Sequence, residues 1–223
     1  MQPNPDAPDA GLEIRPPQQE RTRQRWTRVL DAGLQVLEEG GYEAFTIAAV
    51  CERAQVAPPA IYARVPSKDA LFLAVYEHGM AGLRAEQRIF EDADRWTGLP
   101  AAQLIEQAIV EVAERVLPNA RFLRAVILRS GAHPEIYRRG AEYSREFGDQ
   151  FAGAVLRARP AIRRADPETA VRACFSTIFS ALAVRVSYGP GFATSKPVDD
   201  DAFVAHLVEL GLGYLLPDER HPG

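Results

Sequence analysis

Hydrophobic residues recur at helical spacing over most of the chain, and breaks rich in glycine, proline or asparagine separate the periodic stretches. The first stretch begins near residue 19, and Gly40 and Gly41 follow it. Because glycine tolerates the left-handed backbone that ends many helices, we expect the first helix to stop at these two residues. Its apolar face consists of Trp26, Val29, Leu30, Leu34 and Leu37.

A second, shorter helix is expected to begin after Thr46, whose hydroxyl can cap the unpaired N–H groups of a first turn. Phe45 can reach Val50 across that cap as a hydrophobic staple. After Ala54 the chain turns and starts a third helix at Pro58. Two short helices joined by a tight turn are typical of a helix-turn-helix. The expected core face of the second helix is Ile47, Val50, Cys51 and Ala54.

The third helix starts without a capping side chain, because Ala57 stands where the cap belongs and two prolines follow. Proline has no N–H group to satisfy and fixes φ near the helical value, so Pro58 and Pro59 lower the cost of the missing cap. Together with Ala60 and Ala63 they offer shape and apolar contact but no side-chain hydrogen bonds. If this helix faces DNA, its natural targets are thymine methyl groups.

Further helical stretches follow the third helix, which ends at Pro66. Ser67 caps a long helix with an apolar stripe, and no convincing strand appears later. We therefore predict an all-α fold, with a three-helix helix-turn-helix domain over residues 19–66 and a second, larger helical domain over residues 67–216. Residues 1–18 are expected to be a disordered tail and residues 217–223 a C-terminal tail. The later helices are expected at 100–117, 119–131, 134–158, 167–188 and 199–215.

Composition limits the classes of protein and the cellular compartments that fit this chain. The 223 residues carry a net charge of -4, which argues against coating nucleic acid through bulk charge but leaves room for a local basic face. Cys51 and Cys174 are too far apart in sequence to suggest a disulfide framework, and the polar, proline-rich start does not look like a signal peptide. The longest apolar region, residues 173–186, is too short to span a bilayer and contains Arg185. We expect a cytoplasmic protein with no membrane segment.

Five spaced elements of the first 80 residues resemble the N-terminal domain of TetR-type (TetR/AcrR) transcriptional regulators. They are Phe45-Thr46-Ile47, Val50-Cys51, Ala54-Gln55-Val56, Ile61-Tyr62 and Pro66-Ser67-Lys68-Asp69-Ala70-Leu71. The resemblance implies a homodimeric repressor whose two helix-turn-helix modules occupy successive major grooves of a pseudo-palindromic, double-stranded DNA operator. It also implies that residues 67–216 are a ligand-binding and dimerisation domain, with a pocket for a small molecule that releases the repressor. The sequence departs from the family at Gln55, usually glycine, at Ala57, usually a serine-like cap, and at Val65, usually aromatic.

Carried over residue by residue, the resemblance implies phosphate contacts from Thr46, Tyr62 and Lys68, whose hydroxyl, phenol and ammonium groups suit phosphate oxygens. It also implies a recognition helix from Pro58 to Val65, presenting Pro58, Pro59, Ala60 and Ala63. Arg64 stands where the family often has histidine or another polar residue, and it can hold a phosphate or fork onto a guanine, with phosphate favoured. Upstream lies a basic run that either reaches DNA as an arm or is a solvated first helix: Arg15, Arg21, Arg23, Arg25 and Arg28.

Aromatic and apolar residues on three of the later helices can converge on a pocket for a hydrophobic or aromatic effector, although ordinary core is the alternative for each of them. They are Phe122, Val126, Ile127, Tyr143, Phe147, Phe151, Phe175 and Phe179. Arg172 and Arg185 either meet a carboxylate or face solvent. The last two helices are expected to form a four-helix dimer interface through small residues (Ala170, Ala173, Ser176, Ser180, Ala181, Ala183) and larger ones (Phe203, Leu207, Leu210, Tyr214).

Little in the sequence favours an enzyme. The histidines, His78, His133, His206 and His221, have no partners at metal-ligand spacing and are expected at the surface or at helix caps. The acids 199–201 suit the start of the last helix better than a metal, and Cys51 suits a packed thiol better than a redox switch. We therefore expect a regulator without catalytic residues, metal or cofactor. The alternative is a helical small-molecule transport or storage protein in which the helix-turn-helix is only structural.

Overall fold

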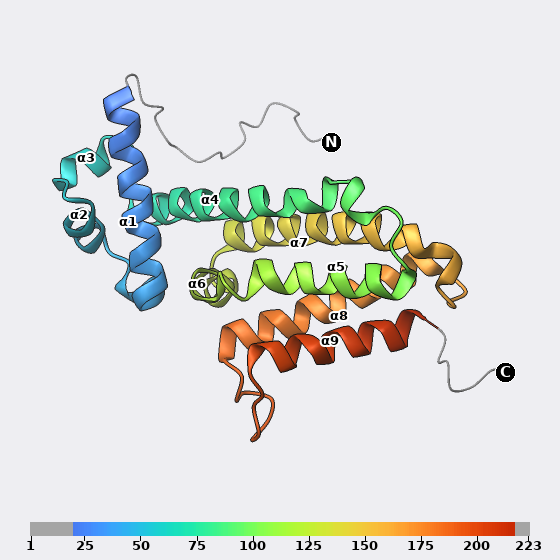
Figure 1. Cartoon of the computed structure of the whole chain (residues 1–223). Helices are drawn as coiled ribbons and strands as arrows, with labels where there is room; N and C mark the ends of the chain where they lie inside the picture. Colours follow the sequence, from blue (N-terminus) through green and yellow to red (C-terminus); the bar gives the residue numbers. More distant parts are fainter. Residues whose placement is uncertain (1–19, 217–223) are drawn as a thin grey trace, which may run out of the picture. The chain divides into compact units, whose positions relative to one another are not determined.

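The computed structural model describes residues 20–216, and within that range every regular element is a helix (Figure 1). The predicted tails, residues 1–18 and 217–223, lie outside the described residues. The chain divides into two compact units, one up to Gly82 and one from Leu83 onward. The all-α prediction is confirmed, as is the order of a small helix-turn-helix unit followed by a larger helical unit.

The first unit contains α1 (Glu20–Ala44), α2 (Ile47–Ala54), α3 (Pro58–Tyr62) and most of α4 (Lys68–Gln87). At the expected end of the first helix, Gly41 has φ 65° and ψ -166°, so the helix kinks there and a further short turn runs on to Ala44. The buried side chains of this unit include Leu37, Phe45, Val50, Ile61 and Phe72.

The first unit extends past the expected domain boundary at residue 66 because the first half of α4 belongs to its core. Leu71, Phe72 and Val75 are fully buried. Helices α1 and α4 approach so closely that a Cβ atom on Gly33 would lie 2.5 Å from Cγ2 of Val75. The ring of Phe72 also packs edge-on against Tyr42 at the end of α1, with centroids 4.9 Å apart. The start of α4 is therefore held by α1.

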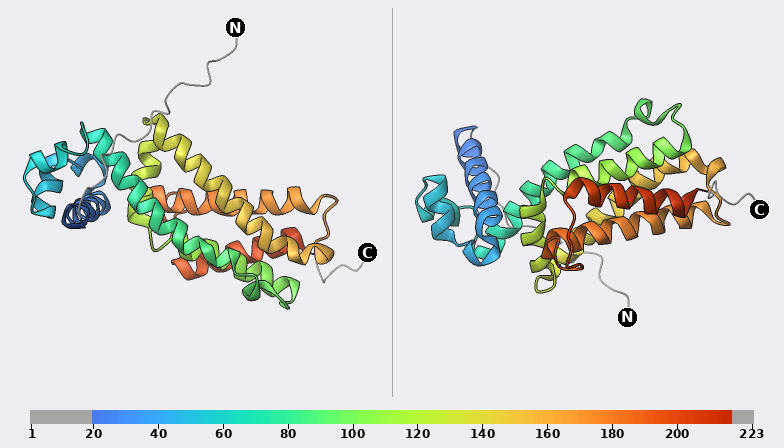
Figure 2. Two further views of the ribbon diagram at one scale, coloured as in Figure 1. Left: turned by 90° about the horizontal axis from the view of Figure 1, so that it is seen from above. Right: turned by 60° about the horizontal axis from the view of Figure 1, so that its bottom comes forward.

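The second unit is a bundle of five long helices, α5 (Ala101–Val116), α6 (Ala120–Ser130), α7 (Pro134–Val155), α8 (Pro167–Tyr188) and α9 (Asp200–Leu215). Their ranges agree with the sequence prediction, except that the third of them gives way after Val155 to a 3-10 helix, η3 (Leu156–Ala161), that contains Pro160. Two further 3-10 helices, η1 (Arg88–Glu91) and η2 (Asp94–Trp96), precede α5. Helices α8 and α9 lie side by side in both views of Figure 2.

Helix α8 extends beyond the apolar stretch at residues 173–186, and by its length and composition alone it could cross a membrane. The core helix of a helical bundle meets the same criteria. Here α8 packs against α6, α7 and α9, and its arginines pair with carboxylates, Arg172 with Asp149 and Arg185 with Asp200. These contacts identify α8 as a core helix of the second unit.

Candidate nucleic-acid interface and effector region

The turn of the helix-turn-helix depends on one polar cap and one left-handed residue. The hydroxyl of Thr46 accepts a hydrogen bond of 3.1 Å from the N–H group of Ala49, which confirms the predicted cap of α2. Helix α2 ends at Gln55, with φ 54° and ψ 50°. Among residues 20–216, Gln55 is the only non-glycine residue with positive φ. The turn does carry a side chain where the family usually has glycine, at the cost of some backbone strain.

The start of α3 also follows the sequence prediction. Ala57 is extended and makes no side-chain cap, and the prolines occupy the first two helical positions. The first N–H group of the helix belongs to Ala60, which donates to the carbonyl of Ala57 at 2.9 Å. Although Ala57 provides no cap, the first two helical positions have no N–H group that would need one, because both are proline.

The exposed face of α3 is almost wholly apolar. Pro58, Pro59 and Ala63 are exposed, Ala60 is half-buried, and the phenol of Tyr62 is 54% exposed. The helix ends at Tyr62, three residues before the expected Val65, although the N–H group of residue 65 still donates to the carbonyl of Ile61. This face offers methyl and methylene groups to a partner, together with one hydroxyl.

The placement of Arg64 differs from the predicted contact with phosphate or guanine. Arg64 is only 8% exposed, and its guanidinium carbon lies 5.3 Å from the ring centroid of Trp26 on α1. Its Nη2 atom donates to the carbonyl of Thr22, at 3.5 Å. Burial lowers the pKa of Arg64, because desolvation disfavours the charged form. In this structure the side chain turns toward α1 and away from the exposed face of α3.

Lys68, at the first position of α4, packs on the end of α1. Its Nζ atom lies 4.1 Å from the ring centroid of Tyr42 and donates to the carbonyl of the same residue at 3.4 Å. The hydroxyl of Tyr42 in turn donates to Oδ1 of Asp69 at 2.7 Å. Sequence reasoning missed this arrangement because the partners are 26 and 27 residues apart. Lys68 stays half-buried, so part of its side chain remains accessible.

The exposed arginines at the start of α1 fit both a DNA-reaching arm and a solvated helix, and the thiol of Cys51 is packed as expected. Arg23, Arg25 and Arg28 are exposed on α1, whereas the other arginines of the predicted arm, Arg15 and Arg21, have no described side chains. Cys51 is buried, and burial raises the pKa of its thiol. A raised pKa suppresses the thiolate that redox chemistry needs.

In the second unit, aromatic rings from α7 and α8 meet around Phe147. Its ring centroid lies 5.6 Å from that of Phe175, 6.2 Å from Phe179 and 6.0 Å from Tyr143. Phe151 joins through Phe175, at 5.5 Å. Sequence reasoning missed Phe90 of η1, whose ring is 5.8 Å from that of Phe147, because it lies outside the periodic stretches. Five of the eight predicted effector residues thus share one cluster.

The other three predicted effector residues, Phe122, Val126 and Ile127, lie on α6, which packs on α7 and α8. Phe122 and Val126 are buried and Ile127 is half-buried. Two polar side-chain atoms of the second unit, Nε2 of Gln87 and Oε1 of Gln150, are buried without a hydrogen-bond partner. Such atoms lose hydration without compensation, which costs free energy in the folded state.

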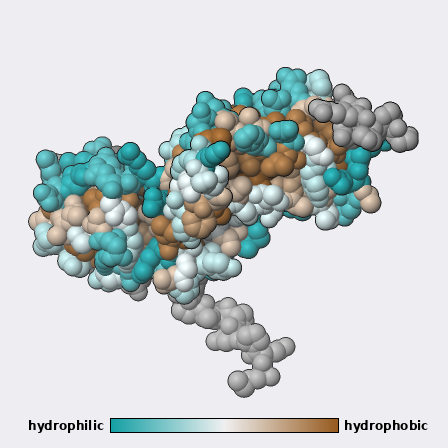
Figure 3. Space-filling view, turned by 90° about the horizontal axis from the view of Figure 1, so that it is seen from below, coloured by the Kyte–Doolittle hydropathy of each residue, from teal (hydrophilic) through white to brown (hydrophobic). Residues whose placement is uncertain are grey.

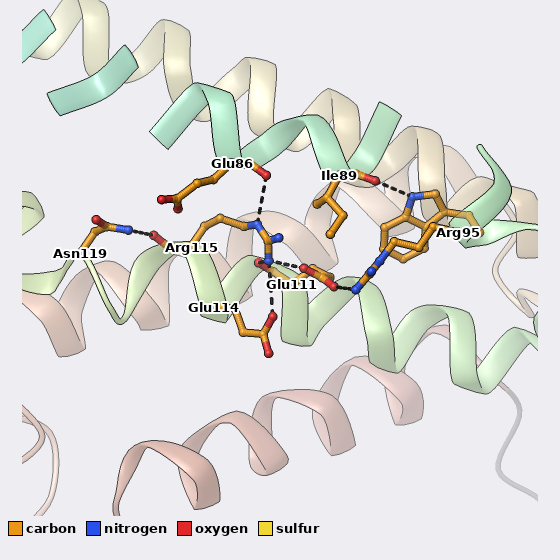
Figure 4. Close-up of polar contacts among 8 residues, drawn as sticks. Glu86, Ile89, Arg95, Glu111, Glu114, Arg115 and Asn119 are labelled. Atoms are coloured by element: carbon orange, nitrogen blue, oxygen red, sulfur yellow. Dashed lines mark hydrogen bonds and ion pairs between the residues drawn. The ribbon is translucent and has the colours of Figure 1, made fainter. Parts of the chain in front are cut away.

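A buried ion cluster, absent from the sequence prediction, ties the 3-10 segment to α5 (Figure 4). The Glu111 side chain is only 3% exposed and pairs with both Arg95 and Arg115. Arg115 also donates to the carbonyl of Glu86 at 3.4 Å, and the indole N–H of Trp96 donates to the carbonyl of Ile89 at 3.1 Å. This cluster positions η1, and with it Phe90.

The outer face of α8 and α9 carries exposed apolar side chains. Leu210 is 67% exposed, and Val184 and Tyr214 are also exposed. Of the small residues expected at an interface, Ala173, Ser176 and Ser180 are exposed while Ala170 is buried. Figure 3 shows hydrophobic residues gathered on the side of the second unit that these two helices form.

The acids at residues 199–201 belong to the start of α9, as predicted. Asp199 caps the helix by accepting a hydrogen bond of 2.8 Å from the N–H group of Ala202, and Asp200 pairs with Arg185. His133 likewise caps α7. Within residues 20–216, no group of three His, Cys, Asp or Glu side chains is arranged to hold a metal ion.

Both units are similar to known protein families. Residues 29–75 match the model of bacterial regulatory proteins of the tetR family, and residues 100–215 match the tetracyclin repressor-like C-terminal domain. The HTH-type transcriptional repressor KstR of Mycolicibacterium smegmatis is 46% identical over 55 residues, which span 25% of this chain and 27% of that repressor. The chain thus matches about a quarter of the length of this relative.

Solved structures share the fold over most of the chain. A TetR transcription regulator from Haloarcula marismortui has a TM-score of 0.65 at 15% identity, over 87% of this chain and all of that one. A regulatory protein of the tetR family from Rhodococcus RHA1 has a TM-score of 0.64 at 18% identity, over 87% of this chain and 99% of that one. With family models covering both units, the chain belongs to the TetR family of bacterial regulatory proteins.

Proposed function

We propose that this protein is a sequence-specific DNA-binding repressor that is released from a pseudo-palindromic operator by a small molecule. The observation that carries the proposal is the first unit, in which a capped α2, a left-handed turn at Gln55 and an exposed α3 lie within residues 29–75, the part of the chain that matches the tetR-family model. KstR, which matches this chain over 55 residues, is itself a repressor. The family supports a regulator acting in the cytoplasm, not an enzyme.

In this proposal, phosphate contacts come from Thr46, Tyr62 and Lys68. Thr46 lies exposed at the N-terminus of α2, Tyr62 is exposed on α3, and Lys68 begins α4. Hydroxyl and ammonium groups at helix N-termini suit phosphate oxygens. Base contacts come from the apolar face of α3, which recognises thymine methyl groups and groove shape. Arg64 is not assigned a DNA contact, since its side chain packs on Trp26.

The proposed DNA-binding form is a homodimer that places two helix-turn-helix units in successive major grooves. Its interface is the outer face of α8 and α9, where apolar side chains are exposed (Figure 3). The proposed effector is hydrophobic or aromatic and binds near the ring cluster around Phe147. The alternative of a transport or storage protein gives no reason for an apolar, exposed α3 that follows a helix-turn-helix turn.

The DNA-binding proposal is tested by selecting genomic fragments that the full-length protein binds and then titrating the selected duplex against a scrambled duplex of equal length. We expect a preferred site whose affinity falls as salt rises, because bound phosphates release counterions. Lys68→Ala should weaken binding to both duplexes alike and reduce the salt slope by about one. Equal binding to every duplex, at low and at high salt, would contradict the proposal.

Two substitutions on α3 separate base contacts from phosphate contacts. Pro59→Ala and Ala63→Ser change exposed surface without touching the buried core, so folding should barely respond. The preference at one or two base pairs should shift by about 1–3 kcal/mol where a contact is lost. If only Lys68→Ala changed the preferred sequence, our placement of α3 on DNA would be wrong.

The dimer proposal is tested with a charged substitution on each of two exposed leucines. Leu210→Glu places a charge on the α8–α9 face, whereas Leu128→Glu does so on α6, where the leucine is 48% exposed. We expect sedimentation to show dissociation to monomers for Leu210→Glu only, because burying an unpaired carboxylate at an interface is costly. Dissociation by the α6 variant alone would place the interface elsewhere.

A further inference from the structure

We infer that Arg64 is a positioning residue for operator discrimination, which acts by holding α3 against the first turns of α1 and not by touching DNA. The inference rests on the proposed DNA-binding function. It concerns how the recognition surface keeps its orientation although α3 is only five residues long and has no side-chain cap.

Helix α3 has few means of its own to hold a fixed orientation. A helix this short is marginal in water, and its stability must come from packing. On its inner side, Ile61 is fully buried and Val65 follows as a second buried anchor. Arg64 follows the last residue of α3, Tyr62, and adds a contact with α1 (Figure 1). Its guanidinium lies over Trp26 and donates to the carbonyl of Thr22.

The contact is directional, which apolar packing alone is not. A guanidinium over an indole face is attracted by the ring quadrupole, and the long hydrogen bond of 3.5 Å to the carbonyl of Thr22 adds a second, weaker restraint on its direction. Trp26 is itself 8% exposed, so the pair is largely shielded from solvent. Shielding strengthens the attraction between cation and ring and reduces its dependence on salt.

The place of the contact gives it a role in recognition. Thr22 and Trp26 lie on the first turns of α1, which also carry the exposed side chains of Arg23 and Arg25. Arg64 therefore fixes the distance between the basic start of α1 and the apolar face of α3 within one unit. A specific site demands that both surfaces fit one duplex geometry, whereas non-specific binding needs only positive charge.

The test uses the full-length protein, the genomic duplex selected above and the scrambled duplex. Arg64→Met keeps the length of the side chain and removes its charge and N–H groups. We expect specific binding to weaken roughly fivefold to tenfold more than non-specific binding, which corresponds to the loss of a contact of modest strength. The salt slope for the selected duplex should stay unchanged, since no phosphate contact is lost. Lys68→Ala is the matched control, with a lower slope and an unchanged preference.

Trp26→Phe provides a second variant that retains a ring but reduces its attraction for the cation. Its loss of preference should not add to that of Arg64→Met, because both changes remove one contact. If Arg64→Met does not melt cooperatively, the same titrations are made with Arg64→Lys and Trp26→Phe. Arg64→Lys should keep part of the preference for the selected duplex, because lysine retains the positive charge. Each affinity is corrected for the fraction of protein that binds DNA, so a variant that is only partly folded shows no change in the ratio of its affinities for the two duplexes.

Three results would overturn the inference. If Arg64→Met lowered the salt slope by about one and weakened both duplexes alike, Arg64 would be a phosphate contact that turns outward on binding. If the preference and both affinities stayed unchanged, Arg64 would have no role in recognition. Additive losses for Arg64→Met and Trp26→Phe would uncouple the two side chains. A wild-type protein without a preferred duplex would instead contradict the proposed function itself.

Discussion

The two units differ in the sequence distance between the residues that create their least usual local features. In the first unit the cap at Thr46, the left-handed Gln55 and the two prolines of α3 all act on groups within a few residues. In the second unit the least expected feature, the buried carboxylate of Glu111, depends on Arg95, which lies 16 residues earlier on η2, as well as on Arg115, which lies one turn further along α5. A sequence pattern therefore predicts the first kind of feature well and the second kind poorly.

The largest effect should come from breaking the long-range feature of the second unit. Glu111→Ala leaves Arg115, whose side chain is 11% exposed, with only the exposed carboxylate of Glu114 at 3.5 Å, and removing one partner of a buried ion pair costs about 3–5 kcal/mol. Chemical denaturation should show this loss in the free energy of unfolding. The matched control is Glu142→Ala, which removes an exposed partner of Arg138 and should cost less than about 1 kcal/mol. Equal losses for the two variants would mean that solvent reaches Glu111.

The helical order of both units could be predicted because each long helix carries its own apolar period and its own stop signals. Every expected helix of the second unit is present within a few residues. Arg64 shows the limit of this reasoning, since its neighbours in sequence place it on the α3 face whereas Trp26, which lies 38 positions earlier by residue number, draws it inward. Phe90 and the pairing of Glu111 with Arg95 were missed for the same reason, because Phe147 lies on α7 and Arg95 on η2.

A second prediction asks whether the first unit also depends on a long-range contact. Gly33→Ala places a Cβ atom 2.5 Å from Cγ2 of Val75, a branched side chain with few alternative rotamers. Overpacking should exceed the gain in helix propensity and lower the free energy of unfolding by about 1–2 kcal/mol. Gly82→Ala, where nothing lies within 4 Å of the new atom, should instead stabilise by up to about 1 kcal/mol. Thermal melting of the two variants should shift in opposite directions.

A third prediction concerns a local feature of the first unit, the left-handed backbone of Gln55. Gln55→Gly relieves the strain of a left-handed backbone but adds entropy to the unfolded chain, so the free energy of unfolding should rise by about 0.5–1 kcal/mol. Gln55→Val, with a branched side chain that fits this conformation worse, should lower it. Denaturant titrations of the two variants test the sign. A glycine variant that is less stable than the wild type would show that the Gln55 side chain makes a compensating contact.

The smallest effect concerns a local charge cluster in the second unit, on α7. The hydrogen bond from Arg138 lowers the pKa of Glu135 to about 2, and Arg139 adds to the shift. Since the folded state has the lower pKa, the stabilisation is present above the ordinary pKa near 4.5 and is lost as pH falls toward 2. Glu135 is partly exposed, so solvent screening should reduce the effect to about 1 kcal/mol or less. Glu135→Gln should therefore destabilise the protein at pH 7 and match the wild type near pH 2, as measured by the difference in melting temperature across that range. A difference independent of pH would assign the effect of the substitution to packing and not to charge.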